Sequence, residues 1–178
     1  MRIISGIHKG RRITAPKNLP VRPTTDMAKE ALFNILNNRY YLNDLAVLDL
    51  FAGTGNIAYE FASRGVKNIT CVDSHQGCVQ FVTKTSEALG LGIFSLRSDV
   101  YAYLERTKDQ FNLIFADPPY DMPIESFERI AGLVFENNLL HQNGALIIEH
   151  AKQMDLAHLP YFSEQRKYGG SAFSFFTR

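Results

Sequence analysis

Residues 45–58 read LAVLDLFAGTGNIA, an apolar run that ends beside the carboxylate of Asp49 and passes through a glycine loop into a helical pattern. Gly53 and Gly55 lie where this strand turns into the helix, and they leave space for a ligand to approach the backbone. Four more strand patterns follow, with helical patterns between them, at 68–73, 93–99, 111–117 and 144–150. Near-continuous apolar strands that alternate with helices indicate a parallel sheet covered on both faces. The sequence therefore predicts a doubly wound α/β fold.

Both ends of the chain depart from this alternation. Residues 1–20 predict a basic β-hairpin extension, in which MRIIS and RRITA flank GIHKG, and a helix is expected to begin near residue 25. The tail, residues 161–178, reads as two strands joined around Gly169-Gly170, so the sheet is expected to end in an antiparallel hairpin. The length of 178 residues fits a single domain over 1–178.

The composition favours a cytoplasmic globular protein. Apolar residues make up 46% of the chain and charged residues 21%, and no apolar run approaches the roughly 20 residues that span a bilayer. Cys71 and Cys78 match neither a redox nor a zinc spacing, so both are expected to be small buried side chains. The scattered histidines indicate no metal site.

Positive charge is concentrated at the beginning of the chain. Residues 1–25 contain no acidic residue, and the overall net charge of +1 therefore leaves the remainder acidic. A basic arm on an acidic body is typical of a protein that binds a polyanion, with nucleic acid as the first candidate. A solvated hairpin that happens to be basic is an equal alternative. The basic side chains of this region are Arg2, Lys9, Arg11, Arg12, Lys17 and Arg22.

The predicted strands end on polar residues that should meet in one cleft, because ligands of doubly wound sheets bind beyond the carboxyl ends of the strands. The spacing Gly53-x-Gly55-x-x-Ala58 also fits a dinucleotide fingerprint. Asp49 argues against a pyrophosphate there, since two like charges at ~4 Å repel by about 4 kcal/mol at an effective dielectric near 20. S-adenosylmethionine instead carries a sulfonium and an ammonium group, so the carboxylate favours this cofactor. The predicted cofactor-binding residues are Asp49, Phe51, Ala52, Gly53, Thr54, Gly55, Asp73, Ser74, Asp99 and Val100.

Within this set, Asp73 and Asp99 follow the next two strands and have different predicted ligands. Asp73 would accept hydrogen bonds from the ribose hydroxyls, and Asp99 with the Val100 backbone would address the adenine amino group. Capping of the turn by Asp49, with ordinary strand-to-helix glycines, is the structural alternative for the loop.

The stretch FADPPYD (115–121) follows the fourth strand pattern and forms a rigid platform, because two consecutive prolines cannot continue a helix or lie inside a sheet. An amino nitrogen of guanine or adenine is a weak nucleophile, since its lone pair is delocalised into the ring. Asp117 can accept one N–H and the Pro118 carbonyl the other, while Pro119 stiffens the loop and Tyr120 stacks on the base. A tight turn after a strand is the competing interpretation.

These residues resemble a known family, and the resemblance runs nearly end to end. It is carried by MRIISGIHKGRRI, RPTTDMAKEALFNIL, VLDLFAGTGNIAYEFASRG, FNLIFADPPY and RKYG. The family is the RsmD-like methyltransferases, which transfer a methyl group from S-adenosylmethionine to N2 of a guanine in 16S ribosomal RNA. The resemblance implies a Rossmann-like methyltransferase fold with a seven-stranded sheet whose last strand is antiparallel. It also implies that Arg22, Thr24 and Thr25 lie near the active cleft and that the N-terminal hairpin contacts RNA.

The leading hypothesis is thus a monomeric rRNA guanine-N2 methyltransferase acting on 16S rRNA or on the assembling small subunit, without a metal or a membrane. The same fold and cofactor can also serve an adenine N6 or a glutamine amide. A nicotinamide oxidoreductase built on the same glycine loop is a third possibility. A non-catalytic RNA-binding protein on this fold is a fourth.

Overall fold

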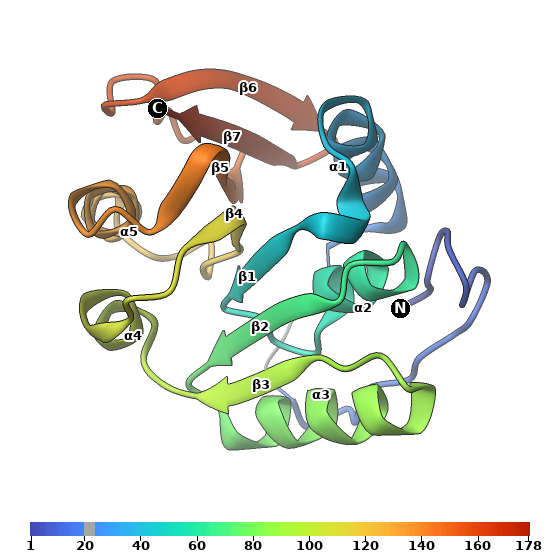
Figure 1. Cartoon of the computed structure of the whole chain (residues 1–178). Coiled ribbons are helices and arrows are strands. Elements are labelled where there is room, and N and C mark those ends of the chain that lie inside the picture. The colour runs from blue at the N-terminus through green and yellow to red at the C-terminus, as the bar shows by residue number, and fades with distance from the viewer. Residues whose placement is uncertain (20–23) are drawn as a thin grey trace.

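A seven-stranded sheet forms the centre of the computed structural model, which describes residues 1–19 and 24–178 (Figure 1). The strand order is β3-β2-β1-β4-β5-β7-β6. Strands β1 to β5 pair in parallel, whereas β7 runs antiparallel to both β5 and β6. This confirms the predicted sheet with an antiparallel last strand. The strands are β1 (Ala46–Leu50), β2 (Asn68–Asp73), β3 (Phe94–Arg97), β4 (Phe111–Ala116), β5 (Leu140–Ala151), β6 (Phe162–Tyr168) and β7 (Ser171–Thr177).

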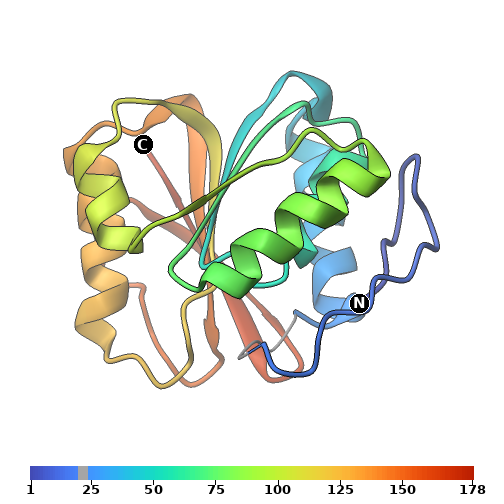
Figure 2. The ribbon, with the colours of Figure 1, turned by 90° about the horizontal axis from the view of Figure 1, so that it is seen from below.

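Helices cover both faces of the sheet. Figure 2 shows α4 and α5 on one face, and α1 and α3 on the other. Thr25 caps the first helix, since its side chain accepts a hydrogen bond from the Ala28 backbone nitrogen. Within residues 1–19 and 24–178, no helix has both the length and the apolar character needed to cross a membrane. The helices are α1 (Asp26–Arg39), the 3-10 turn η1 (Leu42–Asp44), α2 (Asn56–Ser63), α3 (Gln76–Leu89), α4 (Val100–Arg106) and α5 (Ile124–Glu136).

Alternating strand residues fill two hydrophobic cores. Val47 and Leu113 pack in the core shared with α1, α2 and α3, whereas Leu48 and Ile114 pack in the core shared with α4 and α5. All four side chains are buried, which explains why the central strands are apolar at nearly every position. The prediction for the cysteines is confirmed, since both side chains are buried.

The order of the strands places the loops after β1 and β4 side by side. These two strands pair in register, with Leu50 opposite Ala116. The chain continues outward from β1 to β2 and β3 on one side, and from β4 to β5 on the other. Such a reversal of strand order leaves a crevice at the carboxyl ends of the strands, where α/β proteins bind ligands.

The N-terminal arm, defined here as residues 1–13, folds back on itself in a short antiparallel pairing. It forms a single antiparallel bridge between Arg2 and Arg12. The next two backbone donors of the arm bind α2. The nitrogens of Ile4 and Ser5 donate to the carboxylate of Glu60 at 2.8 and 3.0 Å. The nitrogen of Ile3 donates to the Arg11 carbonyl at 2.9 Å and that of Ile13 to the Met1 carbonyl at 3.0 Å, so the two ends of the arm pair as expected for a short hairpin, and the arm is also docked on α2.

A buried polar network strengthens this docking. Lys29 is only 1% exposed, and its Nζ donates to the Arg2 carbonyl at 2.6 Å and to Asn56 Oδ1 at 2.8 Å. The same Nζ lies 3.6 Å from Glu60, which also accepts from Arg64 Nε at 2.8 Å. Burial lowers the pKa of Lys29, and the nearby charge of Glu60 opposes that effect. The arm is thus held to the body through both α1 and α2.

Candidate active site

A cavity of about 500 Å³ opens at the carboxyl ends of the central strands. It lies where the reversal of strand order predicts a ligand site. The structure therefore brings together four segments. They are the glycine loop after β1, Asp73 and Ser74 at the end of β2, the platform after β4, and Thr24 and Thr25 before α1. The predicted site residues that line it are Thr24, Thr25, Asp49, Phe51, Ala52, Gly53, Thr54, Asp73, Ser74, Asp117, Pro118, Pro119 and Tyr120.

The glycine loop has the left-handed backbone that its sequence suggests. Phe51 has a φ of 56°, which is unusual for a residue with a side chain and marks local strain beside the cavity. Gly55 has a φ of +81°, and a Cβ there would lie 2.9 Å from the Tyr59 ring. Gly55 caps α2 rather than lining the cavity. Gly55 therefore allows the sharp turn from the glycine loop into α2.

Asp73 holds the glycine loop in place from the end of β2. One carboxylate oxygen accepts a hydrogen bond from the Gly53 nitrogen at 2.8 Å, and the other accepts from the His75 nitrogen at 2.8 Å. The carboxylate also lines the cavity. Its assignment to the ribose hydroxyls stays a prediction.

Asp49 is a buried acid beside the same cavity. It is 2% exposed, and its Oδ2 has no hydrogen-bond partner among residues 1–19 and 24–178. Burial, and to a smaller extent the charge of Asp73, raises the pKa of Asp49 to about 8. A buried oxygen without a partner is costly, and a cation in the cavity would offset that cost. The residues present therefore fit a cationic ligand such as S-adenosylmethionine.

The DPPY platform forms the opposite side of the cavity. The backbone nitrogen of Asp117 donates to the Leu50 carbonyl at 3.3 Å, so the platform starts directly beside the strand that carries Asp49. The Tyr120 hydroxyl donates to Glu149 Oε1 at 3.0 Å and lies 2.6 Å from Ser171 Oγ. Burial is the main cause that raises the pKa of Tyr120 to about 12. Its ring is partly exposed and is therefore accessible to a base.

Other predicted residues lie outside the cavity. Asp99 caps α4, because its Oδ1 accepts from the Ala102 nitrogen at 2.9 Å, and Val100 is the buried first residue of that helix. Neither lines the cavity, so their adenine assignment stays a prediction. Arg22 lies outside the described residues. The remaining basic candidates lie exposed on the N-terminal arm, namely Arg2, Lys9, Arg11 and Arg12.

Sequence reasoning missed several residues that line the cavity. Glu149 near the end of β5 is the most informative, because it is a carboxylate that is 2% exposed and directly follows the apolar run 145–148. The signal was available, since a charge in ALIIEH at a strand end resembles those after the other strands. Most of the others lie within a few residues of predicted site residues, whereas Ser171 comes from the distant start of β7. These further lining residues are Asn56, Ile57, His75, Cys78, Phe115 and Ser171.

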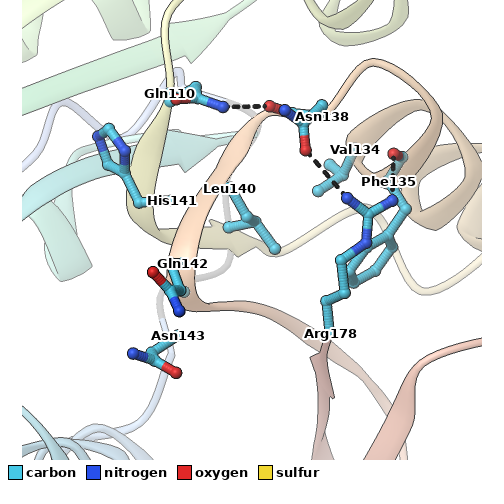
Figure 3. A pocket seen from close by; sticks show the side chains of 10 residues that line it. Gln110, Val134, Phe135, Asn138, Leu140, His141, Gln142, Asn143 and Arg178 are labelled. Atoms are coloured by element: carbon cyan, nitrogen blue, oxygen red, sulfur yellow. Dashed lines mark hydrogen bonds between the residues drawn. The ribbon is translucent and has the colours of Figure 1, made fainter.

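A second cavity, of about 410 Å³, lies near the beginning of β4 and β5 (Figure 3). Its polar groups bond to one another, since Arg178 donates to Asn138 Oδ1 at 3.0 Å and Gln110 donates to the Asn138 carbonyl at 2.9 Å. It contains none of the predicted site residues. The candidate active site is therefore the cavity at the carboxyl ends.

The fold is that of the Rossmann-like S-adenosylmethionine-dependent methyltransferases. A Thermus thermophilus 16S rRNA N2 G1207 methyltransferase, solved with AdoMet and guanosine, shares this fold with a TM-score of 0.71 at 21% identity, covering 90% of this chain and 45% of that one. The chain belongs to the family described as Conserved hypothetical protein 95, whose model matches residues 1–177. This membership confirms the resemblance to the RsmD-like methyltransferases.

Relatives match over most of their length. YlbH of Bacillus subtilis (strain 168) is 33% identical over 161 residues, which cover 88% of this chain and 85% of that protein. Ribosomal RNA small subunit methyltransferase D of Escherichia coli (strain K12) is 29% identical over 161 residues, covering 90% of this chain and 79% of that protein. The structure of the hypothetical protein TTHA0928 from Thermus thermophilus has a TM-score of 0.87 at 26% identity and covers 100% of this chain and 99% of its own.

Proposed function

We propose that this protein transfers the methyl group of S-adenosylmethionine to the exocyclic N2 of a guanine in 16S ribosomal RNA. The observation that carries the proposal is that Asp49 and Asp117, which come from the neighbouring strand β1 and the loop after β4, line the same cavity. One carboxylate suits a cationic methyl donor, and the other suits the N–H groups of an amine. Relatives named ribosomal RNA small subunit methyltransferase D support the choice of substrate RNA.

The cofactor side of the cavity is formed by the glycine loop and the end of β2. When bound, S-adenosylmethionine supplies a methyl group on a positively charged sulfur. Asp49, which is buried beside the cavity, would balance the positive charge of the cofactor, and Asp73 would accept ribose hydroxyls. The backbone at Gly53 is held by Asp73, so the loop is ordered before any ligand arrives. Preorganisation of this kind reduces the entropy lost on binding.

The acceptor side is formed by the DPPY platform. Asp117 accepts one N–H of the amino group and the Pro118 carbonyl accepts the other, which returns electron density to nitrogen and fixes its approach. Tyr120 stacks on the base. The contribution of the protein is therefore position and electrostatics, without a covalent intermediate on the enzyme. A base in a duplex must first be flipped out, at a cost of about a few kcal/mol.

The N-terminal arm supplies the positive charge for an RNA backbone. Lys9, Arg11 and Arg12 are exposed on it, and its docking on α2 holds them in a fixed place relative to the body. Phosphate contacts position a nucleic acid, whereas the cavity selects the base. This division explains why a basic arm and an acidic cavity occur in one chain.

Methyl transfer to defined acceptors tests the proposal. The purified protein is incubated with methyl-labelled S-adenosylmethionine and, in separate reactions, unmodified 16S rRNA, assembled small subunits, DNA or protein extract. Mass analysis of the nucleosides should find N2-methylguanosine in one of the first two reactions. Label on adenine N6 or on protein would contradict the proposed acceptor, and NAD binding without S-adenosylmethionine binding would contradict the proposed chemistry.

A further inference from the structure

We infer that Glu149 is a positioning residue for the acceptor base, acting through the hydroxyl group of Tyr120. Ser171 supports the same hydroxyl from β7. The inference rests on the proposed function, in which the Tyr120 ring stacks on the base. It adds a residue from β5 to a site for which the sequence predicts residues after β1, β2, β3 and β4 and before α1.

The contacts of Glu149 join three separate parts of the chain. Its Oε1 accepts the Tyr120 hydroxyl at 3.0 Å, and its Oε2 accepts the Thr24 hydroxyl at 2.8 Å. Ser171 Oγ, at the start of β7, lies 2.6 Å from the same Tyr120 hydroxyl. The platform, the segment before α1 and the β5–β7 pair are therefore connected at one carboxylate beside the cavity.

A purely structural role explains this carboxylate poorly. Glu149 is 2% exposed, and β5 is already paired with β4 on one side and with β7 on the other. Burying a carboxylate in such a strand is unfavourable compared with an apolar residue that the sheet would accept equally well. The residue lines the cavity, where its two hydroxyl partners also lie. The carboxylate of Glu149 therefore serves the site beside the cavity and not the packing of the core.

Fixing the Tyr120 hydroxyl fixes the ring. The side chain is 36% exposed, and an exposed aromatic ring after two prolines would otherwise sample several rotamers. Hydrogen bonds to two neighbouring strands hold it in one orientation before the base arrives. The base then stacks on a preoriented surface, so less entropy is lost on binding and the amino group is delivered to Asp117 in one geometry.

A double-mutant cycle on methyl transfer tests whether Glu149 acts through Tyr120. The variants are Tyr120→Phe, Glu149→Gln and the double variant, with Tyr41→Phe and Glu87→Gln as exposed controls. Each single active-site variant should lower kcat/KM for RNA by about 5- to 50-fold, and the double variant should match Tyr120→Phe alone within about twofold. Affinity for S-adenosylmethionine should be unchanged, since neither group belongs to the cofactor side. Multiplied effects in the double variant, or full activity of Glu149→Gln, would overturn the inference.

A measurement on the ring separates failure of this inference from failure of the proposed function. In protein with isotope-labelled tyrosine, the Tyr120 ring signals are identified by their loss in Tyr120→Phe. Wild type should give a single fixed ring environment, and Glu149→Gln should give averaged signals. Identical signals would overturn the inference whether or not the protein methylates rRNA. If Glu149→Gln does not fold, Ser171→Ala replaces it in both experiments, with the same outcomes expected.

Discussion

The Asp49→Asn substitution probes the electrostatic basis of cofactor binding. Burial, followed by the charge of Asp73, raises the pKa of Asp49 from its ordinary value of 3.8 to about 8. At pH 7 a group with a pKa of about 8 is roughly nine-tenths protonated, and a cation beside it favours the ionised form. Binding of S-adenosylmethionine at pH 7 should therefore release up to about 0.9 proton from wild type. The asparagine side chain of the variant has nearly the same size and no proton to release.

The same group makes the stability of the free protein depend on pH. Between about pH 4 and pH 8 the native Asp49 stays protonated while the unfolded chain ionises, so the native state binds more protons and stability falls as the pH rises. At 1.36 kcal/mol per pH unit, the upper limit of this loss is roughly 6 kcal/mol, reached above the native pKa. Asp49→Asn should therefore gain stability relative to wild type at pH 8.5 and much less at pH 5.

Two assays check these expectations. Calorimetric titration with S-adenosylmethionine in buffers of different ionisation enthalpy measures the proton release, and subtraction of Asp49→Asn removes the contribution of the ligand's own ammonium group. Urea unfolding at pH 5, 7 and 8.5 measures the stability, with Asp44→Asn as an exposed control. Equal proton release from wild type and Asp49→Asn would refute the assignment of Asp49 to the cationic ligand.

Three further variants test other parts of the protein. Asp117→Ala should lower turnover by about 10²-fold or more, because it removes a preorganised acceptor for the amino group, while calorimetry should find cofactor affinity nearly unchanged. An active variant would show that the acceptor site lies elsewhere. Reversing Arg11 and Arg12 to glutamate should weaken RNA binding and flatten its salt dependence by about 0.7–0.9 in slope for each lost phosphate contact. Equal slopes for variant and parent would remove the arm from the RNA interface. Gly6→Ala should lower the free energy of unfolding in urea by about 1–3 kcal/mol or more. A Cβ at this left-handed position would lie 1.8 Å from the Ser63 carbonyl oxygen. An unchanged unfolding free energy would contradict the docking of the arm on α2.

The central sheet and the meeting of its loops could be predicted from sequence. Apolar runs separated by helical periodicity require a parallel sheet, and the carboxyl ends of parallel strands share one edge. The prediction that Gly53 and Asp117 face one cleft follows from that geometry alone, and the pairing of Leu50 with Ala116 confirms it. Two strands joined around Gly169-Gly170 were equally predictable, because the tail leaves no room for a helix.

Contacts between distant segments could not be predicted. The docking of the N-terminal arm depends on Glu60, more than 50 residues away, which accepts hydrogen bonds from the backbone nitrogens of Ile4 and Ser5. Glu149 lies in the strand pattern 144–150, and the sequence does not predict its hydrogen bond to Thr24, which lies 125 residues away in the chain. A local pattern contains the periodicity of an element but not the identity of what packs against it. Asp99 illustrates the converse, because a polar residue after a strand can serve as a helix cap.

The central claim is that one cavity holds the methyl donor and the amino group that receives the methyl. A crystal structure of the protein with S-adenosylhomocysteine and guanosine tests it most directly. We expect the exocyclic nitrogen of guanine within about 3 Å of both the Asp117 carboxylate and the Pro118 carbonyl, with the base stacked on Tyr120. Guanosine bound elsewhere, or an Asp117 side chain turned away from the base, would contradict the claim.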